Sequence, residues 1–230
     1  MEASEIHRGA CLAPALLARW PAPSVGLTHH GDETGVHVAQ PAQRAQMVVT
    51  TGEFLAMHLP DGKAELVRGE VRVTPPPGAP HGVAAINLIL LLGPYARDHG
   101  LGRVFGDSFG YELIQLPHTV RVPDASFVRA DRLPAGGVGP GLLQFAPDLA
   151  VEVLSPSETA SVLEEKLDDY ATAGTPLIWV VDPHRRTVMI VAANAPVRWL
   201  REDDMLDGGD VVPGFSCLVS AIFEGIARET

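Results

Sequence analysis

The feature that most constrains the fold is a short strand with apolar residues on both of its faces. In Leu149-Ala-Val-Glu-Val-Leu154 the side chains alternate between two faces, and both sets are apolar apart from Glu152. Such a strand needs other elements on both sides, because neither apolar row is suited to water. We therefore expect it to lie in a sheet that has helices on both faces.

The surrounding sequence predicts an α/β domain with a mixed sheet. Ser155-Pro-Ser157 ends the strand and begins a helix to about Ala173, with a serine cap and an acidic first turn. Two short arms around Arg68-Gly69 predict a tight hairpin over 64–73. The other expected elements are a short helix start at Thr51, a helix over 81–99 with a kink or break at Pro94, strands near 103–114, 120–128, 177–182 and 187–192, and a helix over 220–227. Because hairpins pair antiparallel strands, the sheet cannot be all parallel.

Composition places the chain among globular proteins. It has 230 residues, 46% of them apolar, and a formal net charge of −11. We expect one domain over 47–230, preceded by a flexible N-terminal extension over 1–46 that shows no sustained periodicity. Cys11 and Cys217 make neither a disulfide framework nor a zinc site, so a cytoplasmic protein is expected. The acidic balance argues against nucleic-acid binding through a bulk positive field, but not against a site built from a metal and a few basic side chains.

No segment is expected to span a membrane or to serve as a signal peptide. The longest apolar stretch, Val83–Leu92, is interrupted by Asn87 and is shorter than the ~18 residues of a membrane span. Glu2 and Glu5 precede any positive charge at the N-terminus. The apolar stretch belongs instead to the helix expected over 81–99, whose buried stripe we predict as Val83, Ile86, Leu90 and Leu91.

Two acidic residues lie in strands where an unpaired charge is costly. Glu152 must be paired, protonated or bound to a cation, the alternative to a site being a buried ion pair or an edge position that reaches water. Asp124 follows Pro123, which indicates a bulge or edge that can turn the side chain toward a site. The alternative for Asp124 is a turn aspartate that binds its own backbone.

A lysine on the helix after Glu152 completes a possible catalytic trio. Lys166 borders the apolar stripe formed by Leu163, Leu167 and Tyr170, and it could reach the end of the sheet where Glu152 emerges. The alternative is a surface ion pair with Asp169. Two carboxylates and a lysine suit phosphodiester hydrolysis, because Mg²⁺ or Mn²⁺ prefers carboxylate oxygens and an ammonium stabilises the pentacoordinate anion.

Several segments together resemble the Uma-two family of restriction-type endonucleases, within the PD-(D/E)xK superfamily. The resemblance covers about residues 48–225 and depends on the order and spacing of its pieces. These are Glu65-Leu-Val-Arg-Gly-Glu70, Thr74-Pro-Pro-Pro-Gly-Ala-Pro-His81, Val122-Pro-Asp124, Pro147-Asp-Leu-Ala-Val-Glu-Val-Leu-Ser-Pro-Ser157, Lys166 with Tyr170 and Gly174, and Trp179-Val-Val-Asp-Pro183.

The resemblance implies a restriction-endonuclease-like core, a central mixed sheet between helices. It implies that Asp124 and Glu152 are metal ligands and catalytic acids, and that Lys166 replaces the lysine usually found two residues after the glutamate, where this chain has Leu154. Glu70 or Glu65 would supply a further carboxylate, Glu70 as a third metal ligand, and His81 would be a further catalytic residue. Many relatives carry an aspartate four residues before the lysine, where this chain has Val162.

Each added residue also has a simpler interpretation. Glu65 and Glu70 suit a hairpin surface, and His81 suits a helix cap. The histidines His29, His30 and His37 lack zinc-site spacing and are expected in a solvated loop. Trp179 and Tyr170 are expected as core aromatics, and Asp182 as a turn residue that could lie near the site.

The leading hypothesis is a Mg²⁺- or Mn²⁺-dependent endonuclease that acts on DNA, with a homodimer expected by analogy only. The alternative is a catalytically silent nuclease fold that serves as a binding or assembly module, which Val162 and the acidic surface favour. A hydrolase of another phosphate ester also stays open, although no glycine-rich phosphate loop supports it.

Overall fold

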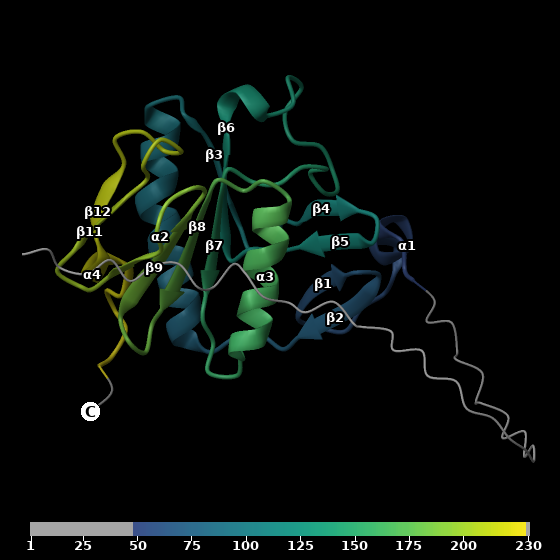
Figure 1. The fold of residues 1–230 in the computed structure, drawn as a ribbon, viewed down its shortest axis with the longest axis horizontal. Coiled ribbons are helices and arrows are strands. Elements are labelled where there is room, and N and C mark those ends of the chain that lie inside the picture. The colour runs from purple at the N-terminus through teal and green to yellow at the C-terminus, as the bar shows by residue number, and fades with distance from the viewer. Residues whose placement is uncertain (1–47, 229–230) are drawn as a thin grey trace, which may run out of the picture. The chain divides into compact units, whose positions relative to one another are not determined.

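The strands form three sheets within residues 48–228, the part of the chain that the computed structural model describes (Figure 1). The six-stranded sheet has the order β10-β9-β8-β7-β6-β3, the four-stranded sheet has the order β2-β1-β5-β4, and β11 pairs with β12. Their bounds are β1 Lys63–Val67, β2 Glu70–Thr74, β3 Gly102–Gly106, β4 Tyr111–Gln115, β5 His118–Arg121, β6 Ala125–Arg129, β7 Leu149–Val153, β8 Leu177–Asp182, β9 Thr187–Ala192, β10 Arg198–Leu200, β11 Met205–Asp207 and β12 Ser216–Leu218. The helices are α1 Thr51–Ala56, α2 Ala79–Asp98, η1 Ala130–Arg132, α3 Ala160–Thr172 and α4 Val219–Ile222.

The strand that was expected to be covered on both faces is β7, and it is fully buried. It pairs parallel with β8 and antiparallel with β6, so the sheet is mixed as predicted. On one face Leu149, Val151 and Val153 pack with the inner side of α2. On the other face Ala150 packs in a cluster that includes Tyr170 of α3. The two helices therefore lie on opposite faces of the six-stranded sheet, which confirms the α/β class (Figure 1).

The predicted hairpin forms the outer pair of the four-stranded sheet. Strands β1 and β2 pair antiparallel with Val67 opposite Glu70. Arg68 and Gly69 have φ of 50° and 80°, and positive φ at both central residues is the requirement of the tight hairpin turn. The pairing Leu66↔Val120 joins this hairpin to β5.

The two long strands expected over 103–114 and 120–128 are each divided. The first becomes β3 and β4, and the second becomes β5 and β6, with one part in each sheet. In the second, Pro123 cannot donate to a ladder, and the chain leaves the four-stranded sheet there to enter the six-stranded one. This bend places Asp124 at the junction of the two sheets.

Helix α2 differs from its sequence prediction in two respects. It continues through Pro94 to Asp98, so the expected break does not occur. Its buried face consists of His81, Ala84, Ala85, Leu88, Leu92 and Ala96, whereas Ile86 and Leu90 are exposed. The predicted stripe was wrong for Ile86 and Leu90, whereas Leu91 packs against the core from a partly buried position; the face on the sheet combines Leu88 and Leu92 with small alanines that allow close approach.

Helices α3 and α4 are displaced or shortened relative to the prediction, whereas α1 begins at Thr51 as expected. Thr159, not a serine of 155–157, caps α3 by accepting a hydrogen bond from the backbone N–H of Val162, and the first turn holds no acidic residue. Thr50 caps α1 in a capping box with Glu53. The final helix α4 is limited to four residues.

Helix α2 is also long and apolar enough to cross a membrane by length and composition alone, with 28% of the relevant stretch buried. In this fold its alanine and leucine face packs on the sheet core. The expected extension over 1–46 and the histidines His29, His30 and His37 lie outside the described residues.

Candidate active site

Asp124 lies at the start of β6, where its carboxylate meets groups from three other elements. Its backbone N–H donates to Val151 O at 2.9 Å, which holds it against β7. Its Oδ2 accepts from the backbone N–H of Val153 at 2.7 Å and contacts His81 Nε2 at 3.1 Å. Its Oδ1 accepts from Lys63 Nζ at 2.8 Å. The aspartate is therefore a fixed, buried carboxylate rather than one that binds its own turn.

Glu152 is completely buried, and two residues of α3 satisfy its carboxylate. Lys166 Nζ donates to Oε2 at 2.8 Å, and the Tyr170 hydroxyl donates to Oε1 at 2.7 Å. Lys166 and Tyr170 are four positions apart, so they lie on one helix face. Lys166 also contacts Glu158 Oε1 at 2.7 Å, just before the helix. The trio of Asp124, Glu152 and Lys166 thus lies at one end of β7, as the sequence predicted.

Lys63 is a second lysine of the site, which the sequence analysis missed. It begins β1, and its side chain is only 18% exposed. Its ammonium binds Asp124 as that of Lys166 binds Glu152, so each buried acid has its own lysine. The hairpin predicted over 64–73 began one residue too late to include Lys63, which lies on the same strand face as Glu65.

Burial and opposite charge together determine the pKa values in the two pairs, Asp124 with Lys63 and Glu152 with Lys166. Burial alone would raise the pKa of Asp124, but the hydrogen bond from His81 and the charge of Lys63 hold it well below its usual range. Burial raises the pKa of Glu152, and the charges of Lys166 and Lys63 oppose that rise. Burial alone would lower the pKa of Lys166, yet the charges of Glu152, Glu65 and Glu158 raise it strongly. Lys166 therefore carries its proton at neutral pH and can supply positive charge, not act as a base.

Glu65 is buried beside the cluster, but its carboxylate is already paired with Arg121. Its Oε2 accepts from Arg121 Nη1 at 2.9 Å, and its Oε1 accepts from the backbone N–H of Val122 at 3.0 Å. Arg121 also binds Asp169 Oδ2 through Nε at 2.9 Å and Nη2 at 2.6 Å. The alternative interpretation of Lys166, a surface ion pair with Asp169, is therefore wrong, because Asp169 faces inward to Arg121.

The remaining expected site residues differ in their placement. His81, in the first turn of α2, contacts Asp124 and is itself buried. Glu70 is not brought to the cluster: its side chain is 65% exposed and pairs with Arg72 at 3.3 Å. Val162 is exposed on α3, so that position adds no polar group near Lys166.

Two further interpretations can be compared with the structure. Asp182 is a turn residue as expected, since its Oδ1 accepts from the backbone N–H groups of His184 and Arg185, each at 3.0 Å. Trp179 is a buried core aromatic. Tyr170 is buried too, but its hydroxyl belongs to the site, which an apolar periodicity alone could not reveal.

The side chains of this site could hold a divalent cation only through one or two carboxylates. Within the described residues no three His, Cys, Asp or Glu side chains form a group that could hold a metal. Mg²⁺, however, needs only one or two carboxylates beside water and substrate phosphate oxygens. At Asp124 and Glu152 a lysine ammonium already contacts a carboxylate oxygen, so each acid is oriented to hold a positive charge.

The fold and this cluster define the restriction-endonuclease-like class. The chain matches the Uma2 family model, described as "Putative restriction endonuclease", over residues 51–220. It belongs to that family, and the resemblance drawn from its motifs is confirmed. Among solved structures it is similar to a "putative nuclease belonging to DUF820" from Anabaena variabilis, with 19% identity, a TM-score of 0.68, and coverage of 76% of this chain and 97% of that one. No curated protein matches the chain.

Proposed function

We propose that the chain is a metal-dependent endonuclease that hydrolyses phosphodiester bonds in DNA. The observation that carries this proposal is the end of β7, where the buried carboxylate of Glu152 holds a protonated lysine at 2.8 Å beside the buried Asp124. Membership of a nuclease family supports the same reaction class.

Asp124 and Glu152 would hold the cation, Mg²⁺ or Mn²⁺. The backbone N–H of Val153 and His81 Nε2 orient Asp124, and the Tyr170 hydroxyl orients Glu152. When bound, the cation would lower the pKa of a water molecule and offset phosphate charge.

Lys166 supplies a second positive charge at the reacting phosphate. In hydrolysis a water oxygen forms a bond to phosphorus and gives up a proton, the bond to the leaving deoxyribose oxygen breaks, and that oxygen takes up a proton. Negative charge accumulates on the phosphoryl oxygens during this exchange, and an ammonium stabilises it. Because its pKa is raised, Lys166 acts through charge. Lys63 is placed to do the same beside Asp124.

The test is cleavage of supercoiled plasmid in the presence of Mg²⁺ or Mn²⁺. We expect Glu152→Gln and Lys166→Met each to lower the rate by about 100-fold or more, the usual effect of removing one such group. Arg97→Gln is the matched control, because Arg97 is an exposed residue at the other end of α2 from His81. Cleavage at the wild-type rate by Glu152→Gln would remove this site from the mechanism. Parallel reactions with an RNA strand of the same sequence test the choice of DNA.

A catalytically silent binding module is the second candidate. It is favoured by the absence of a three-ligand metal group among residues 48–228 and by the lysine partner that each acid already has. Calorimetric titration with Mn²⁺ separates the two candidates. Heat that is present in the wild type and lost in Glu152→Gln supports the nuclease, whereas a folded wild type that gives no heat supports the module.

A further inference from the structure

A basic pocket of about 300 Å³ lies outside the carboxylate and lysine cluster. Its lining comes from the start of α2, the β8–β9 turn and the chain after α4, and consists of Pro80, Pro183, His184, Arg185, Arg186, Glu202, Ile226, Ala227 and Arg228. Three guanidinium groups and one carboxylate are thus present in a chain whose net charge is −11. The pocket is a local exception to the acidic character of the protein.

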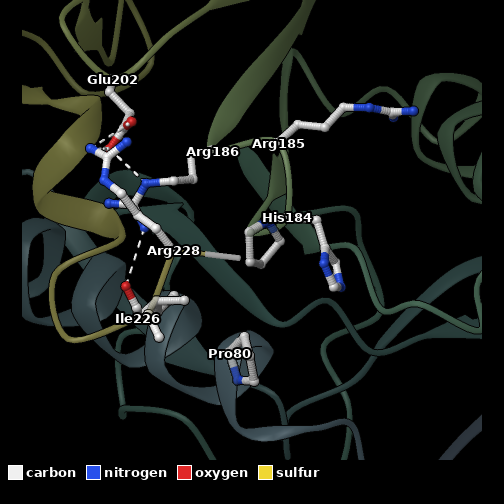
Figure 2. Close-up of a pocket in the computed structure, with 9 residues that line it drawn as sticks. Pro80, His184, Arg185, Arg186, Glu202, Ile226 and Arg228 are labelled. Atoms are coloured by element: carbon white, nitrogen blue, oxygen red, sulfur yellow. Dashed lines mark hydrogen bonds and ion pairs between the residues drawn. The ribbon is translucent and has the colours of Figure 1, made fainter. Parts of the chain in front are cut away.

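The pocket contains one arginine that is fixed in place. Arg186 Nε donates to Glu202 Oε1 at 2.6 Å, and its guanidinium lies 5.2 Å from the centre of the Phe223 ring. Its Nη1 also approaches Ile226 O at 3.4 Å. Figure 2 shows these contacts converging on one side of the pocket. This guanidinium is therefore oriented before any ligand arrives.

The two other arginines are each paired with one acid but are exposed to solvent. Arg228 binds Glu202 Oε2 at 3.0 Å, but its side chain is 72% exposed. Arg185 is 79% exposed, is held to Asp182 only at 3.4 Å, and extends away from Glu202 (Figure 2). Because one carboxylate faces two guanidinium groups, positive charge remains when Glu202 is satisfied. The first turn of α2 adds to this positive charge, because it is the positive end of the helix dipole. The N-cap residue Gly78 has no side chain that could offset it.

The pocket is next to the candidate active site along the chain and across the sheet. Pro80 lines the pocket, and the following residue, His81, contacts Asp124. The β8–β9 turn follows the end of β8, which pairs in parallel with β7, the strand that carries Glu152. Both sites thus lie at the same end of these two strands.

We propose that this pocket binds a backbone phosphate of the nucleic-acid substrate, away from the bond that is cut. The identity of the ligand rests on the proposed nuclease function. Guanidinium groups bind phosphate oxygens through paired hydrogen bonds, and a part-buried Arg186 beside exposed Arg185 and Arg228 suits an anion that enters from solvent. An acidic chain needs such a local contact, because its overall field repels a polyanion.

The experiment measures DNA binding without cleavage. A short labelled duplex is titrated with the protein in EDTA and followed by fluorescence anisotropy, over a series of salt concentrations. We expect the double variant Arg185→Gln/Arg228→Gln to weaken binding about tenfold at low salt and to reduce the slope of log K against log salt by roughly 2. Arg97→Gln/Arg103→Gln removes the same charge from two exposed positions elsewhere, at the end of α2 and on β3, and is expected to leave the slope close to the wild-type value.

The comparison of the wild type, the pocket variant and the control variant tests the inference directly. Equal affinity and equal slope in wild type and pocket variant would overturn it, as would an equal loss in the control variant. Inorganic phosphate serves as the second probe: if it binds the pocket while the pocket variant keeps full DNA affinity, the site takes free phosphate and the inference fails. The replaced side chains are exposed, and thermal unfolding of each variant checks that the fold is retained. Failure of the nuclease proposal is a separate result, because it is read from cleavage by Glu152→Gln.

Discussion

Two groups of buried charges lie side by side in this protein, and they are built from different cations. The arginine network consists of Arg121, Glu65, Asp169, Arg68, Glu165 and Arg72, and it joins α3 to the four-stranded sheet. The lysine cluster consists of Lys63, Asp124, Glu152 and Lys166, with His81 and Tyr170. Both have a buried centre, although Arg68 and Arg72 at the rim of the arginine network reach solvent, and both place carboxylates opposite cations.

The cation determines what each group can do. Arg121 binds two acids at once through three of its nitrogen atoms, so its position is fixed from several directions. A lysine ammonium is a compact charge on a flexible stem, and each acid of the lysine cluster has one such partner. An ammonium can move aside for a metal ion or a phosphate more readily than a guanidinium held at both ends. The arginine network is therefore suited to positioning α3, and the lysine cluster to chemistry.

The largest expected effect comes from breaking the arginine network. Arg121→Met removes the guanidinium from two buried carboxylates and leaves Glu65 with one backbone N–H and Asp169 with Arg68 alone, which should lower the free energy of unfolding by about 3–5 kcal/mol. Urea denaturation measures this loss. The exposed pair of Arg97 with Asp98 is the control, and its removal should cost less than about 0.5 kcal/mol. Similar losses in the two variants would contradict the structural role of Arg121.

A smaller, pH-dependent effect is expected in the lysine cluster. Lys166→Met removes the charge that opposes the raised pKa of Glu152, so the pKa of Glu152 in the folded state should move further above the ordinary value of 4.5. A carboxyl group with a raised folded pKa favours the folded state only at low pH, and stability is lost as the pH rises. The cost should therefore be small near pH ~4.5 and reach about 2–3 kcal/mol near pH ~7.5. A deficit that does not change with pH would show that Glu152 does not take up the proton.

The smallest effect concerns the phenol that holds Glu152. Tyr170→Phe should cost about 1.5 kcal/mol, because it removes a hydrogen bond to a charged acceptor. Tyr111→Phe is the matched control, since Tyr111 is equally buried but contacts the neutral hydroxyl of Ser126 at 2.7 Å. Its cost should be below that of Tyr170→Phe, as measured by thermal unfolding. The reverse order would argue against a charged Glu152.

The sequence predicted those parts of the fold that follow from local patterns. The bounds of β8 and β9 agree with prediction because their apolar runs end at turn residues. Gly174, with φ of 87°, lies just after the end of α3, where it was expected to end the helix. The proximity of Asp124, Glu152 and Lys166 was predicted from polar residues in apolar surroundings and from family motifs, and their catalytic role stays a prediction.

The rest depends on contacts between distant segments. Nothing local indicates that Arg121 meets Asp169, 48 positions later, or that Lys63 reaches Asp124. The division of the strand expected over 120–128 depends on a second sheet that sequence periodicity does not reveal. The buried face of α2 was mispredicted for a similar reason. Which face of the helix is buried depends on how it packs on the sheet, and the helical periodicity alone does not show this.

The position of Lys166 on a helix has a consequence for recognising relatives of this chain. In a motif read along one strand, the carboxylate and the lysine keep a constant separation in the sequence. Here the acids are fixed by the backbone ladder, and the ammonium is fixed by how α3 is anchored to its neighbours. A relative could lengthen the loop between Leu154 and Thr159 and still present its ammonium at the same point in space. Searches that count residues from the glutamate would overlook such proteins, whereas searches for the arginine anchor of the helix would find them.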